Sequence, residues 1–504
     1  MSDFLAGAGL LIAAAASAAA ILLPAGRLRS IAMLAAIVLF PILILGDQWH
    51  TSQIVDLRHS TGRIIGLAAI GIVTVTVLAY IFRRWPTLLP LAIVAALPFR
   101  IPLHAGGDTA NLLVPLYLVI AGGALAALAG GTGGEAENGA SLPRPQASPP
   151  VTGPASRAAL WLPRVLAAVV VLYALQTLYS EDFSKGLQNA CFFLVPFTVA
   201  YALIQDVKWD NRLLKLVLIV VAAEALLFVG IGTVEYVTRS LFWNDAVIRS
   251  NEFHTYFRIN SVFWDPNVFG RYLALVLVVV TTALLWARDR RDFWLLAGTI
   301  LVLWIGLAQT FSQSSFIALL AGLAVLAAIR WSWRWTLAAV VVGLVGAVLV
   351  VTLVGGKGIS FNRLNIDTSG RASLVQGGLD LFGERPIWGY GSGSFQQAYA
   401  AHRENKDLPV SVSHTEPVTV AAEQGLVGLA LYLALIVVAL WAMTAGLKGR
   451  RAGRAAVLAA FVALLVHTMS YAGFFEDPIT WVLLAIGAAL ASTPFVAAEV
   501  RDPT

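Results

Sequence analysis

Apolar runs of about 20 residues recur along almost the whole chain, and short polar stretches separate them. A helix of that length spans about 30 Å, the thickness of the hydrocarbon core of a bilayer. The runs lie at 4–23, 29–46, 64–82, 86–103, 110–129, 159–179, 187–205, 212–236, 267–287, 292–309, 313–330, 334–354, 425–446, 454–472 and 478–497. This pattern predicts an all-α polytopic membrane protein with about 15 transmembrane helices, within a range of 13–16.

One of these runs, 86–103, is interrupted by prolines. It contains Pro86, Pro90, Pro98 and Pro102, and proline removes a backbone donor and breaks helices. We therefore expect a short, broken or re-entrant segment at this position.

The composition is that of a membrane protein rather than a soluble domain. Of the 504 residues, 59% are hydrophobic and 12% are charged, whereas soluble domains carry about 25% charged residues. The formal net charge of +6 requires no nucleic-acid partner, because basic loops also orient membrane proteins. The partner that the composition predicts is the lipid bilayer.

Basic residues are distributed unequally between alternate loops. One set of loops holds 20 of the 34 lysines and arginines. The short loops of the opposite set contain Arg58, Arg63, Arg100 and Lys185. Because cytoplasmic loops are enriched in Lys and Arg, the first set is predicted to be cytoplasmic and the long segments 237–271 and 355–413 to face outward.

The stretch 130–158 is rich in Gly, Pro, Ala and Ser, and such a composition cannot bury a core. We interpret it as a disordered cytoplasmic linker. The predicted organisation is therefore an N-terminal transmembrane bundle at 1–129, this linker, a central bundle at 159–354, an extracytoplasmic loop at 355–413 and C-terminal transmembrane helices at 414–504.

The large outer loop combines arginines with aromatic side chains, among them Arg371, Arg385 and Trp388. Arginine binds phosphate oxygens through two parallel hydrogen bonds, and aromatic faces can stack on sugar rings. The loop therefore suits anionic head groups and sugars, although a solvated loop with an aromatic lid explains the same residues. The stretch "WGYGSGSF" could expose backbone N–H groups to an anion, but a plain turn is the favoured interpretation.

The smaller outer segment precedes a predicted helix start. Asp265 is a good N-cap and Pro266 a good first helical residue. Capping does not explain Arg258 on the outer side, or Arg271, which lies about one turn into an apolar helix. A charge at that depth usually pairs or binds a ligand, and Glu224 is a possible partner for Arg271.

Near the end of the large loop, Pro417 predicts the start of another helix, since proline is tolerated only in the first turn. The helix should begin near Thr415 or Glu416, which places His414 at its N-terminal end. An imidazole there is close to neutral at physiological pH and can accept a proton, but it could equally be a cap or an interfacial side chain.

Two glycines follow along the same predicted helix. If the helix is continuous, Gly425 and Gly428 fall about 20° and −40° from the direction of His414. Glycines permit close approach of a neighbouring helix. We therefore predict a glycine stripe that packs against another helix below His414.

These motifs resemble the O-antigen ligase and O-antigen polymerase-like family of bacterial envelope glycosyltransferases. The family pattern of His, a small polar residue, nine residues and Gly-x-x-Gly is matched from His414 to Gly428, with Thr415 in the second position. "SGR" at 369–371 followed by "PIWGYGSGSF" at 386–395 resembles the family's outer loop, and Arg258 before "DPN" at 265–267 is a third similarity. The family often has Ser-Arg after a short outer turn, where this chain has Gln313.

The resemblance implies a C-type glycosyltransferase-like fold and a donor glycan on undecaprenyl diphosphate, with transfer to an acceptor hydroxyl and inversion at the sugar. It implies no metal, nucleotide or other cofactor, in agreement with the lack of an Asp-x-Asp pair among the 16 aspartates. His414 would be the general base, and Arg371 and Arg258 would neutralise the diphosphate. Further predicted substrate-binding residues are Asp265, Asn267, Arg385, Trp388 and Glu416, with Gly425 and Gly428 structural.

Several alternatives stay open. A polymerase that joins repeat units would use the same chemistry and the same motifs. A transporter should have polar or broken helices at mid-membrane depth. Here the polar residues lie mainly at the outer ends of the predicted helices, apart from Glu224 and Glu235. A non-catalytic envelope scaffold is a further possibility. The predicted location is the bacterial cytoplasmic membrane, and the acceptor could be a glycan, a lipid or a protein.

Overall fold

The computed structural model describes residues 3–49, 51, 55, 61–105, 108–130, 154–242, 244–253, 256–354, 370–402, 412–445, 447 and 452–492. Most of the predicted linker 130–158, and residues 355–369 and 403–411 of the predicted outer loop, lie outside these ranges.

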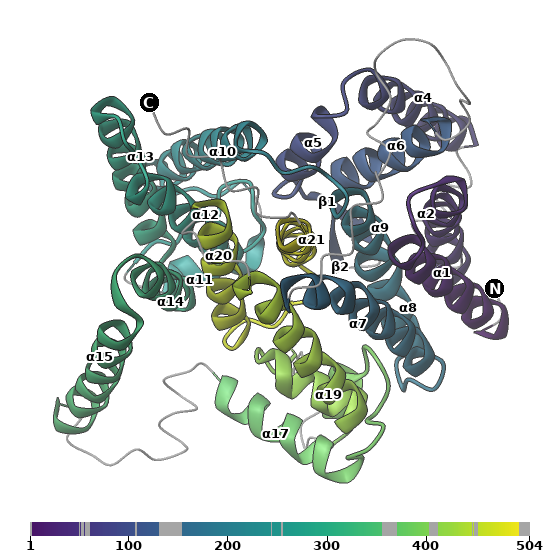
Figure 1. The fold of residues 1–504 in the computed structure, drawn as a ribbon. Helices are drawn as coiled ribbons and strands as arrows, with labels where there is room; N and C mark the ends of the chain where they lie inside the picture. Colours follow the sequence, from purple (N-terminus) through teal and green to yellow (C-terminus); the bar gives the residue numbers. More distant parts are fainter. Residues whose placement is uncertain are drawn as a thin grey trace, which may run out of the picture.

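The described residues of the N-terminal part form five apolar helices and one antiparallel pair of strands, shown in Figure 1. These elements are α1 (Asp3–Leu22), α2 (Arg27–Asp47), α4 (Thr61–Arg84), α5 (Leu88–Ala96), β1 (Ile101–Ala105), β2 (Asp108–Leu112) and α6 (Val114–Gly130).

The central part is entirely helical in the described residues. Its elements are α7 (Pro154–Thr177), α8 (Phe183–Asn189), the π-helical turn η1 (Ala190–Leu194), α9 (Val195–Ile204), α10 (Asn211–Thr238), α11 (Asp245–Phe253), α12 (Pro266–Leu285), α13 (Arg290–Thr310), α14 (Gln313–Ala327), the π-helical turn η2 (Ala328–Ser332) and α15 (Trp333–Val354).

In the C-terminal part, the described residues form two helices of the predicted outer loop and then three apolar helices. These are α17 (Arg371–Glu384), α18 (Phe395–Ala401), α19 (Glu416–Thr444), α20 (Ala452–Thr468) and α21 (Pro478–Ser492).

The helices confirm a polytopic α-helical membrane protein. Ten helices in the described part of the chain are long and apolar enough to cross a membrane, and three shorter apolar helices, α6, α20 and α21, accompany them. The predicted count of about 15 is not reached. One reason is that α14, η2 and α15 form one continuous helix, of which Gln313–Val345 is a single candidate span, although two were predicted there.

The other reason lies in the proline-rich run at 86–103. Its helix α5 has only nine residues, and β1 then pairs antiparallel with β2, with Ile101 opposite Leu112. The segment is therefore short, as expected, but the hairpin was not predicted. The all-α prediction is wrong at this one place in the described residues, because proline ended the helix and left the backbone to pair with a second extended strand.

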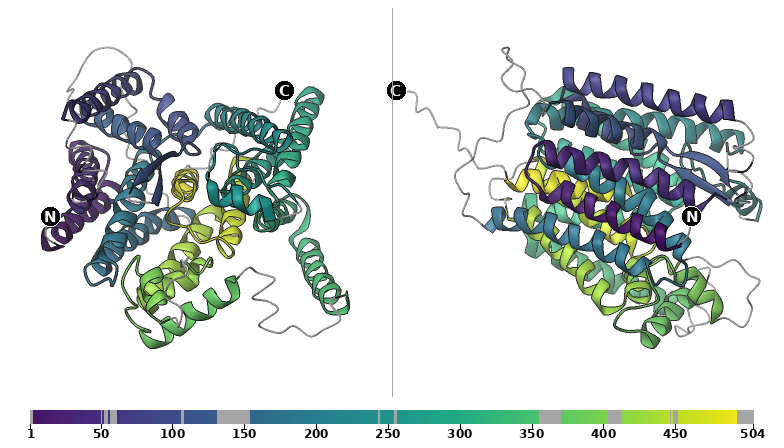
Figure 2. Two further views of the ribbon diagram at one scale, coloured as in Figure 1. Left: turned by 180° about the vertical axis from the view of Figure 1, so that it is seen from behind. Right: turned by 90° about the vertical axis from the view of Figure 1, so that its right-hand side faces the viewer.

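Two buried helices organise the bundle around the candidate site. Helix α21 lies near its centre and packs against α7, α9, α19 and α20 (Figure 1). Helix α12 packs against α10, α13, α14 and α20. These contacts bring the N-termini of α12, α14 and α21 to the same region as the C-terminal end of α20, and α17 and α18 lie at one end of the bundle (green, right-hand view of Figure 2).

Helix α15 is placed differently from the other spans. It extends away from the bundle (Figure 1), and Trp333, Trp335 and Val342 are exposed on it. Exposed apolar side chains on a spanning helix are expected to face lipid, and tryptophans gather at the membrane–water interface. The bundle core therefore lies on the side of α12 and α21.

Candidate active site

Several of the predicted site residues lie at or just before the N-termini of helices. Arg258 and Asp265 precede α12, Arg371 is the first residue of α17, and His414 lies two residues before α19. Helix N-termini carry a partial positive charge and unpaired N–H groups, so a group of them favours anions. The sequence prediction that these residues belong to one site is consistent with this arrangement.

Arg258 is anchored by α12 and α13. Its Nε donates to the carbonyl oxygen of Thr310 at 3.0 Å, and its Nη2 donates to Oδ1 of Asn267 at 3.0 Å. Burial lowers the pKa of Arg258, and the carboxylate of Asp265 raises it. Arginine stays charged at any physiological pH, so Arg258 is a fixed cation within reach of Asp265 and Arg371.

Asp265 and Asn267 support Arg258 rather than extend into an open cleft. Asp265 caps α12, as predicted, by accepting a hydrogen bond from the backbone N–H of Asn267 at 2.6 Å. The amide oxygen of Asn267 accepts bonds from Arg258 and from the hydroxyl of Ser312 at 3.0 Å. The "DPN" motif therefore starts the helix and orients the arginine before it.

Arg371 joins the same region from α17. Its Nη1 donates to the carbonyl oxygen of Ser470 at 3.3 Å, which follows α20. The preceding Gly370 has φ +84°, a conformation that glycine adopts at little cost. This turn starts α17 at Arg371 and directs the helix away from the end of α20.

His414 has a strained backbone and a half-buried ring. Its φ is +60°, which is uncommon for a residue with a Cβ and is found more often at functional sites. The ring centroid lies 6.0 Å from that of Tyr471. Burial lowers the pKa of His414, Arg371 lowers it further, and Asp265 opposes both effects. The imidazole is therefore predominantly neutral at pH 7 and is suited to accept a proton.

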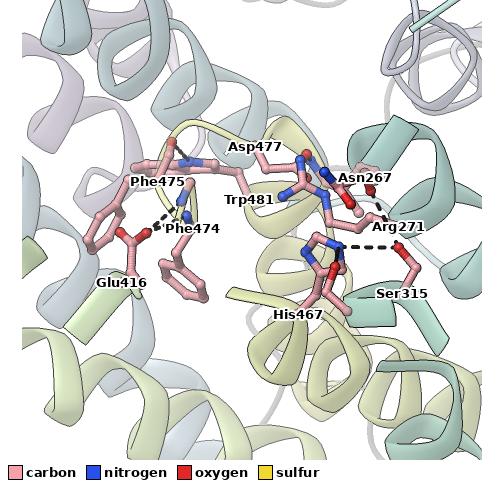
Figure 3. A network of polar contacts seen from close by, with 12 residues as sticks. Asn267, Arg271, Ser315, Glu416, His467, Phe474, Phe475, Asp477 and Trp481 are labelled. Atoms are coloured by element: carbon pink, nitrogen blue, oxygen red, sulfur yellow. Dashed lines mark hydrogen bonds and ion pairs between the residues drawn. The ribbon is translucent and has the colours of Figure 1, made fainter. Parts of the chain in front are cut away.

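Glu416 begins α19, close to the predicted start near Thr415 or Glu416, and Thr415 precedes it as the N-cap. Its carboxylate is buried and accepts hydrogen bonds from the backbone N–H groups of Gly473 at 2.6 Å and Phe474 at 3.0 Å (Figure 3). These bonds hold the loop between α20 and α21. The geometry favours a structural role for Glu416 over the predicted contact with substrate.

Two further predicted substrate-binding residues lie at the far end of α17. Arg385 follows this 14-residue helix, so it lies about 20 Å along the helix from Arg371. Arg385 pairs with Glu181 at 2.8 Å and stacks over the ring of Tyr390. The side chain of Trp388 is exposed, and its carbonyl oxygen accepts from the hydroxyl of Tyr179 at 2.7 Å. The structure therefore does not bring Arg385 and Trp388 to the cluster around His414.

The predicted glycine stripe is wrong because α19 is not continuous. Gly425 has φ +63° and ψ −162°, which interrupts the helix. A Cβ at Gly425 would lie 2.3 Å from the carbonyl oxygen of Ile387, and one at Gly428 would lie 2.1 Å from Cβ of Gln424. The two glycines instead make room for the chain at Ile387 and for a side chain of α19 itself.

The glycine run "WGYGSGSF" lies beside the break in α19, against Ala422 and Glu423. The carboxylate of Glu423 accepts hydrogen bonds from the N–H groups of Gly393 at 2.9 Å and Phe395 at 3.2 Å. Its carbonyl oxygen accepts a hydrogen bond from the backbone N–H of Gly391 at 2.8 Å. The run therefore holds a carboxylate of the protein, so the turn interpretation is favoured over binding of an external anion.

Arg271 pairs with a residue that sequence reasoning did not select. Its Nη2 lies 2.8 Å from Oδ2 of Asp477, and both side chains are buried. The suggested pairing with Glu224 is wrong, since the carboxylate of Glu224 accepts from the hydroxyl of Tyr272 at 3.2 Å instead. Asp477 directly precedes Pro478 at the start of α21, and this capping position was the signal that could have identified it.

His467 was also missed. It lies near the end of α20, fully buried, and its Nε2 is 3.2 Å from Oγ of Ser314 and 3.3 Å from Oγ of Ser315 (Figure 3). Its ring is 5.9 Å from that of Tyr471. Tyr471 is thus a neighbour of His414, His467 and Arg271. The guanidinium carbon of Arg271 lies 5.9 Å from the centre of the tyrosine ring.

Among the described residues, no group of three or more His, Cys, Asp and Glu side chains is arranged to hold a metal ion.

An apolar groove starts beside this cluster. It has a volume of about 290 Å³ and is formed by α5, α10, α12, α20 and α21. Tyr272 and Ile479 line it near the cluster, and Asn211 and Lys215 line it at the start of α10. The groove can accept a hydrocarbon chain that continues from a polar group bound in the cluster.

The fold and the cluster together define a polytopic membrane protein with a basic, histidine-containing site at the starts of its helices. A family model described as "O-Antigen ligase" matches residues 298–433, about a quarter of the chain. The match confirms the resemblance to the O-antigen ligase-like family over the segment that contains Arg371, His414 and Gly425. Comparison with curated proteins gives no match.

Proposed function

We propose that the protein transfers a glycan from undecaprenyl diphosphate to an acceptor hydroxyl, in the manner of an O-antigen ligase. The observation that carries this proposal is the position of His414, a neutral and half-buried imidazole within electrostatic reach of Arg371. A base beside fixed cations suits a reaction in which a hydroxyl is deprotonated while a diphosphate leaves.

In the proposed step, His414 removes the proton of the acceptor hydroxyl as its oxygen attacks the anomeric carbon of the donor sugar. The bond between that carbon and the phosphate oxygen breaks, and the electron pair stays on the diphosphate. Arg258 and Arg371 stabilise the charge that develops on this oxygen. The product sugar is inverted, and the proton on the imidazole returns to solvent.

The apolar groove supports a donor that carries a lipid. It begins beside Tyr272, the residue that follows Arg271 in α12. A polyprenyl chain in the groove would therefore continue directly from a diphosphate in the cluster. Both halves of such a donor would have a matching surface, one apolar and one basic.

The direct test uses the full-length protein purified in detergent or reconstituted in nanodiscs. It is incubated with undecaprenyl-diphosphate-linked glycan and candidate acceptors, and products are separated by size. We expect donor consumption with release of undecaprenyl diphosphate, and its absence with every acceptor would contradict the proposal. A single addition indicates a ligase, whereas a ladder of products indicates the alternative, a repeat-unit polymerase.

The transporter alternative makes a different prediction. A transporter moves a solute across a sealed membrane and leaves the donor chemically unchanged, so detergent-solubilised protein would show no reaction. Movement of labelled glycan into proteoliposomes without bond cleavage would replace the transferase proposal.

The location in the bacterial cytoplasmic membrane, with α17 and α18 on the outer side, is part of the same proposal. It is supported by the basic residues of alternate loops. In this orientation the cluster would face the side of the membrane on which the sugar donor is exposed.

A further inference from the structure

Arg271 is a buried arginine whose hydrogen-bonding capacity is only partly used. The side chain is 4% exposed. Only Nη2 approaches Asp477, while Nε and Nη1 are buried and have no hydrogen-bond partner among the described residues. Arginine and carboxylate groups that pair for stability often use two parallel bonds, so this single contact leaves two donors available.

Asp477 is held in place by its other oxygen. Its Oδ1 accepts from the backbone N–H of Ile479 at 2.9 Å, at the start of α21. The carboxylate therefore cannot turn to meet Arg271 with both oxygens without giving up this bond. Asp477 therefore holds the Nη2 group of Arg271 and leaves Nε and Nη1 without a partner among the described residues.

Charges of both signs surround Arg271, because Glu416 and Glu476 lie within its electrostatic range beside further arginines. Arg100 lies within electrostatic range of both Arg271 and Asp477, and Arg371 and Arg271 both act on His467. Asp477 is already engaged by Arg271. An anion that entered this region would therefore meet the unpaired donors of Arg271.

Arg271 also lies deeper in the bundle than Arg258. It follows the N-cap Asp265 by six residues, which is about 9 Å along the axis of α12. Arg258 contacts Asn267 in the first turn of that helix. The next residue, Tyr272, lines the apolar groove. Arg271 is thus placed between the outer arginines and the space for a hydrocarbon chain.

We propose that Arg271 is a further phosphate-binding residue, which contacts through Nε and Nη1 the phosphate attached to the lipid chain, and that Asp477 is its positioning residue. The identity of this phosphate rests on the proposed function, whereas the binding of a diphosphate anion does not. Arg258 and Arg371 then act on the phosphate attached to the sugar, where charge develops during the reaction.

This division predicts different kinetic effects for the two groups of arginines. The charge of the lipid-side phosphate changes little during the reaction, so Arg271 binds ground state and transition state alike. Its loss should raise the KM for donor about tenfold or more while kcat stays within about threefold of the parent. Loss of Arg258 or Arg371 should mainly lower kcat.

The test compares Arg271→Met, Asp477→Leu and the double variant in the full-length purified protein. Each single change leaves one charge of a buried pair uncompensated and can impair folding, but removing both charges together is often close to neutral for stability. Folding is checked by gel filtration and melting temperature. Arg249→Met is the matched control, because Arg249 is an exposed arginine of α11.

The probes are inorganic pyrophosphate, as a competitor and as a direct ligand in calorimetry, and the lipid-linked donor. We expect the folded double variant to bind pyrophosphate about tenfold or more weakly and to show the rise in KM. Unchanged pyrophosphate binding and KM in the folded double variant would overturn the inference and leave a purely structural ion pair. If the parent binds pyrophosphate through Arg271 but transfers no glycan, the proposed function fails while the anion site stands.

Discussion

The carboxylate of Glu423 lies 2.9 Å from the backbone nitrogen of Gly393 and accepts its hydrogen bond. The same carboxylate accepts from Phe395 at 3.2 Å. A residue of α19 thus holds the glycine run beside the break in that helix at Gly425. This contact fixes part of the segment between α17 and α19 against α19 itself.

We expect Glu423→Ala to destabilise the protein, because it leaves the N–H groups of Gly393 and Phe395 without an acceptor. Each orphaned group costs about 1–3 kcal/mol. Glu423→Gln keeps one acceptor and should have an intermediate effect. The measurement is the melting temperature of the purified variants, with Glu252→Ala on the exposed surface of α11 as the control. A melting temperature equal to that of the parent would show that the run is held by other contacts.

His414→Ala should reduce glycan transfer by about 10²–10⁴-fold, the usual cost of losing a general base. Donor binding should be retained. In the parent, activity should fall on the acid side as the imidazole is protonated. The midpoint should lie below 6.5, the ordinary pKa of histidine, because burial and Arg371 both disfavour the imidazolium form.

The measurement is a pH–rate profile of the parent, His414→Ala and Arg371→Gln. Removing the positive charge of Arg371 should raise the pKa of His414, so the acid limb of the remaining activity should move to higher pH. Activity of His414→Ala within a few-fold of the parent, with the same acid limb, would place the base elsewhere.

Arg371→Lys and Arg258→Lys should each lower kcat by about 10²–10³-fold at normal protein abundance. Lysine keeps the charge but loses the planar, two-pronged geometry that suits phosphate. Arg258→Lys should also lose at least one of its contacts to Thr310 and Asn267. Steady-state kinetics with saturating donor measures the effect, and Arg249→Lys is the control. Full turnover in both lysine variants would remove these residues from the diphosphate site.

Gly425→Ala should prevent correct folding. The residue has φ +63°, and an added Cβ would lie 2.3 Å from a backbone oxygen of Ile387, which cannot move away as a side chain would. Gly383→Ala in α17 is the matched control, because a Cβ there meets nothing within 4 Å and alanine is the better helix former. The yield of monodisperse protein distinguishes the two, and equal yields would contradict the geometry of the break.

The predicted orientation can be tested with single cysteines placed on a variant in which Cys191 is replaced by alanine. We expect a cysteine at Gln396 in α18 to react with an impermeant thiol reagent in intact cells, and one at Asn211, at the exposed start of α10, to be protected until the membrane is opened. The basic residues of alternate loops are the physical reason. Labelling of only the second position in intact cells would invert the orientation.

Local signals in the sequence determined a large part of this picture. The apolar runs predicted most of the spanning helices, because each helix must satisfy its backbone groups within one segment in a bilayer. The N-cap Asp265 correctly placed the start of α12 at Pro266, and Pro417 placed the start of α19 near Thr415 or Glu416, where it lies. The positions of these two helix starts also drew attention to Asp265 and His414 as candidate site residues. This was possible because an N-cap and a first-turn proline act within a few residues of the chain.

Contacts between residues distant in the chain were decided by the tertiary structure. The pairing of Arg271 with Asp477, the bonds of Glu416 to the loop after α20, and the break at Gly425 filled by residues 386–388 depend on which helices pack together. Periodicity assumes a regular helix, so it could not foresee a break created by another segment. The sequence alone determined where several helices start and which polar side chains lie at those N-termini. Only the packing of the helices decided which of these N-termini lie close together.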